Sequence, residues 1–241
     1  MSNINIPILM YHSVESMPKS TVMRSLHVPP RKFKLQMWML KKLGYKGLSL
    51  NKLKPYLDGE KRGKVVGITF DDGYKNNLIN AAPILLKYNF SATCFIVSER
   101  IGASNIWDLE KKITQRPLMS KNEIKEWINL GMDIGAHSKT HPDLTSISFD
   151  KVKEELFDCK RDLEDFFKIP ISGFCYPFGR LNESILNEVR NSGYSLAVTM
   201  QRGRVQRNTN IYNLPRIPVN HRTLPHLFLV KILTSYENNK K

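Results

Sequence analysis

Two aspartates and two histidines have the types and spacing of a site for a divalent cation. Asp71 and Asp72 are adjacent and follow an apolar run, whereas His137 and His141 lie four residues apart. Neighbouring carboxylates at the end of a buried strand are costly unless a partner neutralises them. Two imidazoles and one carboxylate make a ligand set that leaves positions open for water and substrate. The pattern indicates metal-assisted hydrolysis, in which the ion activates water and polarises a carbonyl oxygen.

Each motif by itself also has a simpler interpretation. An Asp-Asp-Gly sequence often forms a turn that begins a helix, and a pair of histidines is often part of a surface or a core. Gly73 allows the backbone to turn so that both carboxylates can reach one cavity. The two histidines could share a helical turn or a compact loop. The combination of both motifs favours the metal site over the simpler interpretations.

Strands and helices that alternate along the chain must position these residues. Apolar runs predict strands, and amphipathic stretches with capping residues predict helices. The expected strands are 6–11, 65–70, 92–97, 132–135, 173–176, 194–199 and 217–219. The expected helices are 30–43, 51–57, 77–88, 120–130, 149–167 and 182–191. The polar, basic segment 201–210 is predicted to be a surface loop.

This alternation predicts a parallel sheet with right-handed crossovers. Roughly six or seven such units favour a barrel-like α/β fold, and an open doubly wound sheet is the alternative. In both folds the loops at the carboxyl ends of the strands build the active site. His12 and the segments 71–73, 137–141 and 177–179 each follow a predicted strand. We therefore expect all four to meet at one site.

Residues 69–73 (TFDDG) and 137–141 (HSKTH) resemble the first two motifs of the NodB-homology polysaccharide deacetylases, carbohydrate esterase family four. The resemblance covers about residues 7–219. It implies a distorted (β/α)7 barrel that removes N-acetyl groups from amino sugars in a metal-dependent reaction. We expect a single deacetylase domain over residues 1–241, with a C-terminal helix and tail from about residue 223.

The resemblance also implies a role for each residue of these two motifs. Asp72, His137 and His141 would hold the metal, most often Zn²⁺, with Co²⁺, Ni²⁺ or Mn²⁺ as alternatives. Asp71 would be the catalytic base. The cation would then also explain how two carboxylates persist side by side.

Residues 174–179 (FCYPFG) resemble the third motif of the family, which lines the substrate groove. The backbone N–H of Phe178 would help to stabilise the oxyanion. The neighbouring motif residues assigned to substrate and oxyanion binding are Tyr176, Pro177 and Gly179. Cys175 stands where the family usually has an Arg that orients the catalytic Asp, and Arg216 is the candidate replacement.

The general acid is assigned from a second departure. No apolar strand that ends in a histidine is evident near the C-terminus, whereas residues 8–14 (ILMYHSV) match the N-terminal segment of the branch that includes poly-N-acetylglucosamine deacetylases. The motif order is permuted in that branch, which implies that His12 is the acid. Tyr74 and Trp107 are further candidates for the pocket, although Trp107 could equally pack in the core.

The charge of the chain suggests an anionic partner. Of the formal charge of +15, residues 1–64 contribute +10, residues 65–199 contribute −2 and residues 200–241 contribute +7. The basic ends could face a diphosphate lipid, a phosphorylated sugar or the inner-leaflet surface, or could simply provide solubility. The three cysteines form no paired pattern, and neither a secretory signal nor an apolar stretch of about 18 residues is visible. We therefore expect a cytoplasmic protein, with peripheral contact to an anionic membrane or a lipid-linked sugar.

Two alternatives to an N-acetyl sugar deacetylase remain at this point. The same scaffold could hydrolyse another amide, such as a formamido sugar or a cyclic ureide, because the third-motif Arg is missing. A catalytically weak protein that binds nucleic acid or an anionic surface would also explain the charge. No zinc finger, helix-turn-helix or RNA-stacking motif is evident, so no nucleic acid is expected. No oligomeric state is predicted.

Overall fold

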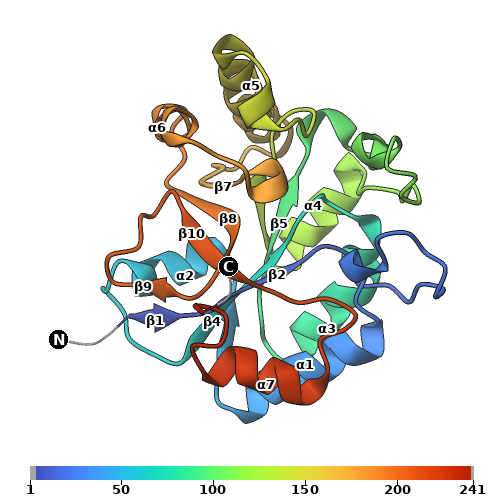
Figure 1. Cartoon of the computed structure of the whole chain (residues 1–241), viewed down its shortest axis with the longest axis vertical. Helices are drawn as coiled ribbons and strands as arrows, with labels where there is room; N and C mark the ends of the chain where they lie inside the picture. Colours follow the sequence, from blue (N-terminus) through green and yellow to red (C-terminus); the bar gives the residue numbers. More distant parts are fainter. Residues whose placement is uncertain (1–3, 240–241) are drawn as a thin grey trace.

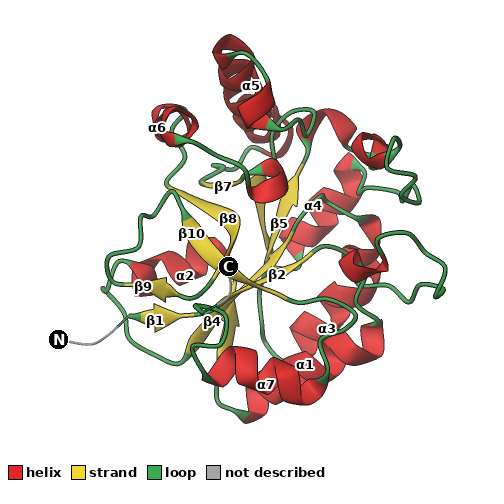
Figure 2. Cartoon of the chain, in the orientation of Figure 1, coloured by secondary structure: helices red, strands yellow, loops and turns green. Residues whose placement is uncertain are grey.

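The computed structural model describes residues 4–239, and its centre is a ring of parallel strands surrounded by helices (Figures 1 and 2). Around the ring the order is β2, β4, β5, β6, β7, β8 and β10, and β10 pairs again with β2. The strands are β1 (Asn5–Ile6), β2 (Ile8–Tyr11), β3 (Lys46–Leu48), β4 (Val65–Phe70), β5 (Thr93–Ile96), β6 (Asp133–Ala136), β7 (Gly173–Cys175), β8 (Leu196–Arg202), β9 (Val205–Gln206) and β10 (Leu214–Pro218). The helices are α1 (Pro30–Lys42), α2 (Leu50–Leu57), α3 (Ala82–Lys87), α4 (Lys121–Asn129), α5 (Phe149–Phe167), α6 (Glu183–Asn191) and α7 (Pro225–Leu233).

The pairing of β2 decides between a barrel and an open sheet. This strand pairs with β4 on one side and with β10 on the other, so the last strand of the ring returns to the first. The barrel prediction is confirmed, and the doubly wound alternative is wrong. The ring is distorted because β4 also pairs along Val65–Gly67 with β3, a strand that the sequence did not predict.

The segment 201–210 is only in its second half, residues 207–210, the surface loop that its composition predicted. Strand β8 continues to Arg202, and β9 pairs antiparallel with β1. Arg204 between them is buried and donates hydrogen bonds to the backbone carbonyls of Asn5 and Ile232. A guanidinium that binds backbone carbonyls can be buried, so basic composition alone did not indicate exposure here.

One predicted helix begins with a different geometry. The expected helix 77–88 consists of a π-helical turn, Asn77–Ala81, followed by α3. Asn77 in this turn is buried and donates from Nδ2 to the carbonyl of His12 at 2.7 Å. Turns of this kind often occur at functional sites, and this one fixes the backbone of the proposed general acid.

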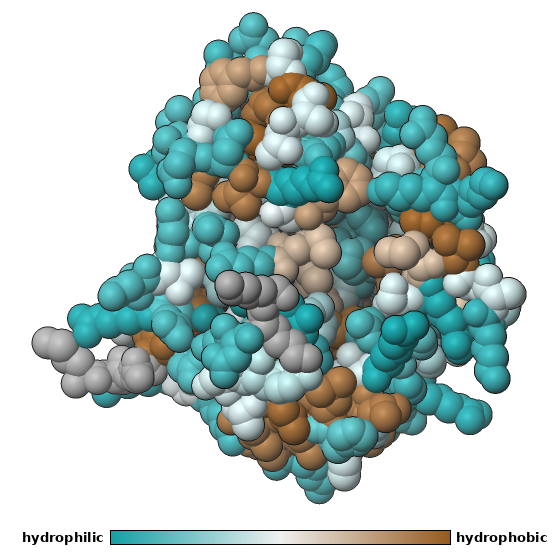
Figure 3. Space-filling view, in the orientation of Figure 1, coloured by the Kyte–Doolittle hydropathy of each residue, from teal (hydrophilic) through white to brown (hydrophobic). Residues whose placement is uncertain are grey.

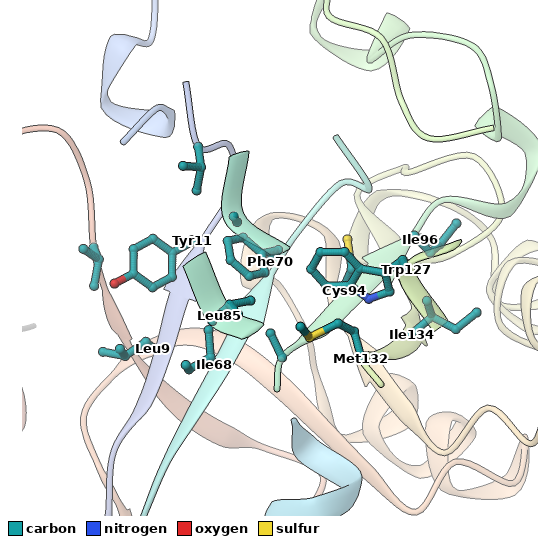
Figure 4. Packing of buried hydrophobic residues seen from close by; sticks show 14 of the residues in the cluster. Leu9, Tyr11, Ile68, Phe70, Leu85, Cys94, Ile96, Trp127, Met132 and Ile134 are labelled. Atoms are coloured by element: carbon teal, nitrogen blue, oxygen red, sulfur yellow. The ribbon is translucent and has the colours of Figure 1, made fainter. Parts of the chain in front are cut away.

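The core lies in two layers, one between the barrel and its helices and one inside the barrel. In the outer layer, Tyr11, Phe70 and Trp127 form a chain of ring contacts from β2 to α4 (Figure 4). Inside the barrel, Phe95 fills the space beside Gly135, where an added Cβ would lie 2.6 Å from the Phe95 ring. The interior is therefore closed by packed side chains, and function is confined to the ends of the strands.

The C-terminal helix predicted by the sequence is α7, which packs Phe228 and Ile232 into the core. Its outer face is apolar, and Figure 3 shows hydrophobic residues gathered over it at the bottom of the view. Val230 and Leu233 are exposed there. Within residues 4–239, no helix combines the length and apolar character needed to cross a membrane.

Candidate active site

A cavity of about 150 Å³ lies at the carboxyl ends of the barrel strands. His12, Asp71 and His137 directly follow β2, β4 and β6, so strand pairing brings their backbones to one end of the ring. The backbone N–H of Asp71 donates to Tyr11, next to His12, at 3.0 Å. The residues that line the cavity are His12, Met23, Leu26, Asp71, Asp72, Trp107, Asp108, Lys111, Ile113, His137, His141, Tyr176, Phe178 and Met200.

Asp72, His137 and His141 converge on one point in this cavity. The Nε2 atoms of His137 and His141 lie 3.4 and 3.5 Å from the same carboxylate oxygen, Oδ1 of Asp72. All three residues are buried. Their ligand atoms lie within 4.8 Å of one another, which is the arrangement of three protein ligands around one cation.

The hydrogen bonds around Asp72, His137 and His141 are better explained by a bound cation than by direct hydrogen bonds among these three side chains. Nδ1 of His137 donates to the carbonyl of Cys175 at 2.7 Å, which turns the Nε2 lone pair towards Asp72. Fixing one ring nitrogen by an outer hydrogen bond is the usual preparation of a metal-binding histidine. A lone pair beside a carboxylate oxygen needs a proton or a metal between them. The contacts with Asp72 therefore need either an added proton on His137 or a cation, and a divalent cation can bind all three residues at once.

The backbone reaches this geometry through left-handed conformations. Asp72, Ser138 and His141 have φ values of 72°, 62° and 69°. Such conformations are uncommon outside glycine and concentrate at functional sites. They show that the two histidines lie in a compact loop and not on a helical turn. After this turn the Asp72 carboxylate faces His137 and His141, whereas the Asp71 carboxylate faces Arg216.

Arg216 holds Asp71 from beneath the cavity. Its Nη1 and Nη2 atoms donate to the two carboxylate oxygens at 2.7 and 2.8 Å. The other donors are used by the Thr199 carbonyl, Thr69 Oγ1 and the Cys175 sulfur, so all five N–H groups have partners. The structure thus places Arg216 where the sequence analysis expected a replacement for the missing Arg, and Cys175 packs against it.

A second set of possible metal ligands, Asp71, His137 and Cys175, fits a cation less well. Both oxygens of Asp71 already accept from Arg216, and the Cys175 sulfur accepts from it as well. Burial raises the pKa of the Cys175 thiol, which keeps it protonated. Metal-binding cysteines are thiolates, so the cluster around Asp72 is the better candidate.

The two aspartates are both ionised, for different reasons. Burial opposes ionisation of Asp71, but the charge of Arg216 and its hydrogen bonds lower the pKa of this carboxyl. Burial likewise opposes ionisation of Asp72, and its contacts with the imidazoles lower its pKa. Burial and the neighbouring His137 lower the pKa of His141 to about 3, so this ring is neutral near pH 7. A neutral ring has the lone pair that a cation requires.

His12 stands at the entrance on the side of Asp71. Its Nε2 atom lies 3.9 Å from Oδ2 of Asp71, and 17% of its side chain is exposed. The imidazole therefore lies beside the first carboxylate and lines the open cavity. Its position is that of a group able to exchange a proton with a bound molecule.

Aromatic rings form the wall beside the candidate metal ligands. Trp107 stacks on His141 with ring centroids 4.4 Å apart, and Phe178 meets the same imidazole edge-on at 4.8 Å. Lys111 lies over the Phe178 ring at 4.4 Å. Trp107 therefore lines the cavity, and the alternative that it packs only in the core is not what the structure has.

The other residues that were predicted to bind substrate either only border the cavity or lie outside its lining. Tyr176 borders the cavity, but its hydroxyl donates to the carbonyl of Tyr212. Pro177 is buried, and Gly179 approaches Met200 so closely that an added Cβ would lie 2.5 Å from it. Tyr74 is buried next to Asp72, and burial together with that carboxylate raises its pKa well above the usual value. Pro177, Gly179, Tyr74 and Arg216 lie outside the lining of the cavity.

The sequence analysis missed two charged residues of the cavity. Asp108 is almost fully buried, accepts from Asn105 at 3.1 Å and has a pKa raised by burial. Lys111 lies over the ring of Phe178, which also contacts His141. Both belong to the loop that follows β5, and only their neighbour Trp107 was singled out. The signal available was the position of this loop after a barrel strand.

Comparison with known proteins gives one consistent family. The model of the family "Polysaccharide deacetylase" matches residues 58–197. YxkH of Bacillus subtilis (strain 168), named for that family, is 32% identical over 216 residues, which cover 89% of this chain and 71% of that protein. Poly-beta-1,6-N-acetyl-D-glucosamine N-deacetylase of Staphylococcus aureus is 28% identical over 86% of this chain and 73% of that protein. The Streptococcus pyogenes deacetylase PplD, solved with acetate, has a TM-score of 0.82 and 28% identity, over 96% of this chain and 99% of that one.

Proposed function

Because the chain belongs to the polysaccharide deacetylase family, we propose that it hydrolyses the N-acetyl group of an amino sugar in a polysaccharide, glycolipid or lipopolysaccharide precursor. Family membership confirms the resemblance predicted from the motifs, and with it a hydrolase of amide bonds. One observation carries the proposal. A carboxylate held by Arg216 stands beside a three-residue cation cluster, and both open into a single cavity.

The proposed cation ligands are Asp72, His137 and His141, and the proposed metal is Zn²⁺, with Co²⁺, Ni²⁺ or Mn²⁺ as alternatives. When bound, the ion would polarise the amide carbonyl and lower the pKa of a water molecule. The neutral His141 ring and the outward hydrogen bond of His137 support this assignment. The nitrogen and oxygen donors suit Zn²⁺ well.

Asp71 is proposed as the base that takes a proton from the attacking water. Arg216 keeps this carboxylate ionised and fixes its plane, and each oxygen retains a lone pair beyond its bond to Arg216. His12, on the same side of the cavity, is proposed to protonate the departing amine nitrogen. With base and acid on neighbouring loops, one proton can be removed and another delivered within a single cavity.

The proposed substrate contacts lie on the wall formed by the rings that contact His141. Phe178 has a left-handed backbone, with a φ of 57°, and its N–H is the proposed donor to the oxyanion. Trp107 provides a flat apolar surface suited to the face of a sugar ring. Tyr176 completes the border of the cavity.

The two alternatives are less well supported. The missing third-motif Arg was the reason to consider formamido sugars and cyclic ureides, and the bond of Arg216 to Asp71 supports our proposal that Arg216 takes over its role. A protein that only bound anionic surfaces would have no need of a base, its arginine and a cation cluster in one cavity. The N-acetyl sugar is therefore the substrate class that we propose.

We propose the reducing cytoplasm as the place of this reaction. Cys94, Cys159 and Cys175 are all unpaired and buried. Free buried thiols are typical of reducing compartments.

The experiment that tests the function measures acetate release from an N-acetylglucosamine oligosaccharide, with the bound metal measured in parallel by mass spectrometry. Asp71→Asn should lower the rate by about a thousandfold or more, because the base is lost, while the metal content stays at the level of the unchanged protein. Asp72→Asn should lose both the metal and the activity. Asp150→Asn, on the exposed start of α5, serves as the control. Full activity in Asp71→Asn would overturn the mechanism.

A further inference from the structure

A second hollow, of about 470 Å³, lies beside the catalytic cavity. It is formed by residues 19–25, in the loop after β2, and residues 220–222, in the loop after β10. Because β2 and β10 are paired parallel strands, both loops emerge at the same end of the barrel as His12. Met23 lines both hollows, so they are neighbours that share a wall.

The two hollows differ in their charged lining. The catalytic cavity is lined by the carboxylates of Asp71, Asp72 and Asp108 together with one cation, Lys111. The charged residues that line the second hollow are Lys19, Arg24 and Arg222, and no acidic residue of the described range 4–239 lines it. A run of cations without carboxylates creates a local positive potential that attracts anions.

A fourth cationic side chain lies next to this hollow. Lys32, on α1, donates from Nζ to the backbone carbonyl of His221 in the wall of the hollow. Among residues 4–239, none of Lys19, Arg24, Lys32 and Arg222 forms an ion pair with a carboxylate. The exposed cations of α5 are different, since Lys151, Lys153 and Arg161 all have acidic partners within their own helix.

His221, which lines the hollow, has an unsatisfied polar atom. Its Nδ1 atom is buried and has no hydrogen-bond partner in the described part of the chain. Burial lowers the pKa of this imidazole, and the charges of Arg24, Arg222 and Lys32 lower it further. The positive charges of three separate segments therefore act on one point in the wall of the hollow.

We propose that this hollow, formed by residues 19–25 and 220–222, is a subsite for a phosphate group covalently attached to the glycan whose N-acetyl group is hydrolysed. The inference rests on the proposed function and narrows its substrate to an anionic, phosphate-bearing glycan. Arg24 and Arg222 supply planar guanidinium donors suited to phosphate oxygens, and Lys19 supplies a further charge. The shared wall at Met23 allows one glycan to place its acetamido group by Asp72 and its phosphate by Arg24.

The proposed subsite also gives a function to part of the excess positive charge of the chain. Lys19, Arg24 and Lys32 belong to the basic segment 1–64, and Arg222 belongs to the basic segment 200–241. The fold brings these two distant segments together at one side of the cavity, while the near-neutral middle of the chain supplies Asp71, Asp72 and the histidines of the cation cluster.

The test compares an N-acetylglucosamine trisaccharide with the same trisaccharide carrying one phosphate monoester. The variant Arg24→Gln/Arg222→Gln should raise KM for the phosphorylated substrate by about tenfold or more, as expected when charge-assisted hydrogen bonds are lost. Its kcat, and both parameters for the neutral substrate, should stay unchanged. The control Lys61→Gln/Arg62→Gln removes the same charge from the loop that leads into the amino end of β4. It should leave KM unchanged for both substrates.

Equilibrium binding separates a local subsite from general attraction. The protein should bind the phosphorylated trisaccharide more tightly than the neutral one, and the difference should shrink with added salt and disappear in the double variant. If inorganic phosphate alone or anionic lipid vesicles bind at this surface and the phosphorylated trisaccharide gains nothing, the proposed source of the phosphate is wrong.

The two proposals fail in different ways. Equal KM values for both trisaccharides, unchanged in the double variant, would overturn the subsite and leave the deacetylase intact. Absence of acetate release from both trisaccharides, with metal bound, would overturn the deacetylase and the subsite defined by it.

Discussion

The two sides of the catalytic cavity use adjacent aspartates in opposite ways. On one side, both oxygens of Asp71 accept from Arg216, whose five donors are all satisfied. On the other side, Asp72 faces two imidazole nitrogens that both approach the same oxygen. The first side is complete within the protein, and the second is complete only with a proton or a cation. Residue type alone therefore does not assign a catalytic role to an aspartate. The groups that surround each carboxylate determine that role.

The backbone at Asp72 produces this division. Successive residues of a strand point to opposite faces, and the left-handed φ of 72° at Asp72 turns the chain immediately after the buried strand β4. Asp71 therefore keeps the direction set by the barrel and meets β10, while Asp72 enters the loop region and meets the histidines. Three predictions test this division, beginning with the largest effect.

Removing the partner of Asp71 should have the largest effect. Arg216→Met leaves a carboxylate buried without its counter-ion, which costs about 3–5 kcal/mol of unfolding free energy. Chemical denaturation of the metal-free protein measures this change. The double variant Asp71→Asn/Arg216→Met should recover part of the loss, because the uncompensated charge is gone. Equal stability of Arg216→Met and the unchanged protein would show that the two sides do not differ in this way.

Metal removal should affect only the side of the cavity that contains Asp72. A cation that binds the folded state alone stabilises it by about 2.7 kcal/mol when its concentration is a hundred times its Kd. Chelation should therefore lower the Tm of the unchanged protein and of Asp71→Asn by similar amounts. The Tm of Asp72→Asn should not respond to metal or chelator. A response of equal size in all three proteins would place the metal elsewhere.

The pH dependence of the metal-free protein should give the smallest effect. The pKa of His141 is about 3 in the folded state and near 6.5 when unfolded, so the unfolded chain binds more protons between these values. Stability should fall as pH decreases through this window, and His141 contributes at most about 1.4 kcal/mol per pH unit to the slope. His27, whose pKa is lowered by burial to about 4, contributes in the same direction. The pKa of Asp71 is lowered by folding, so its contribution is lost only at a pH below about 4.

His141→Gln provides the comparison for this measurement. The variant should flatten the slope between about pH 4 and 6.5 and leave the loss of stability at lower pH unchanged. An identical slope in both proteins would show that His141 is not the group whose protonation is prevented by folding.

Much of the fold and of the site could be read from short segments. Strand β4 and helix α5 have the bounds that their patterns predicted, because local periodicity and caps fix both. The sequence around Asp71 and Asp72, with its following glycine, predicted a turn into one cavity. The loop prediction was wrong for residues 201–206, because the burial of Arg204 depends on hydrogen bonds to Asn5 and Ile232, which lie far away in the chain.

The order of residues along the chain predicts which side chains are available for chemistry and which strand each one follows. The closed barrel then determines which of these side chains meet. Arg216 reaches Asp71 across 145 residues because β10 lies beside β2, which in turn pairs with β4. The same closure of the ring brings Arg24 and Arg222 together beside the cavity. Residue types and periodicities are local properties, whereas the register between distant strands is set by packing of the whole barrel.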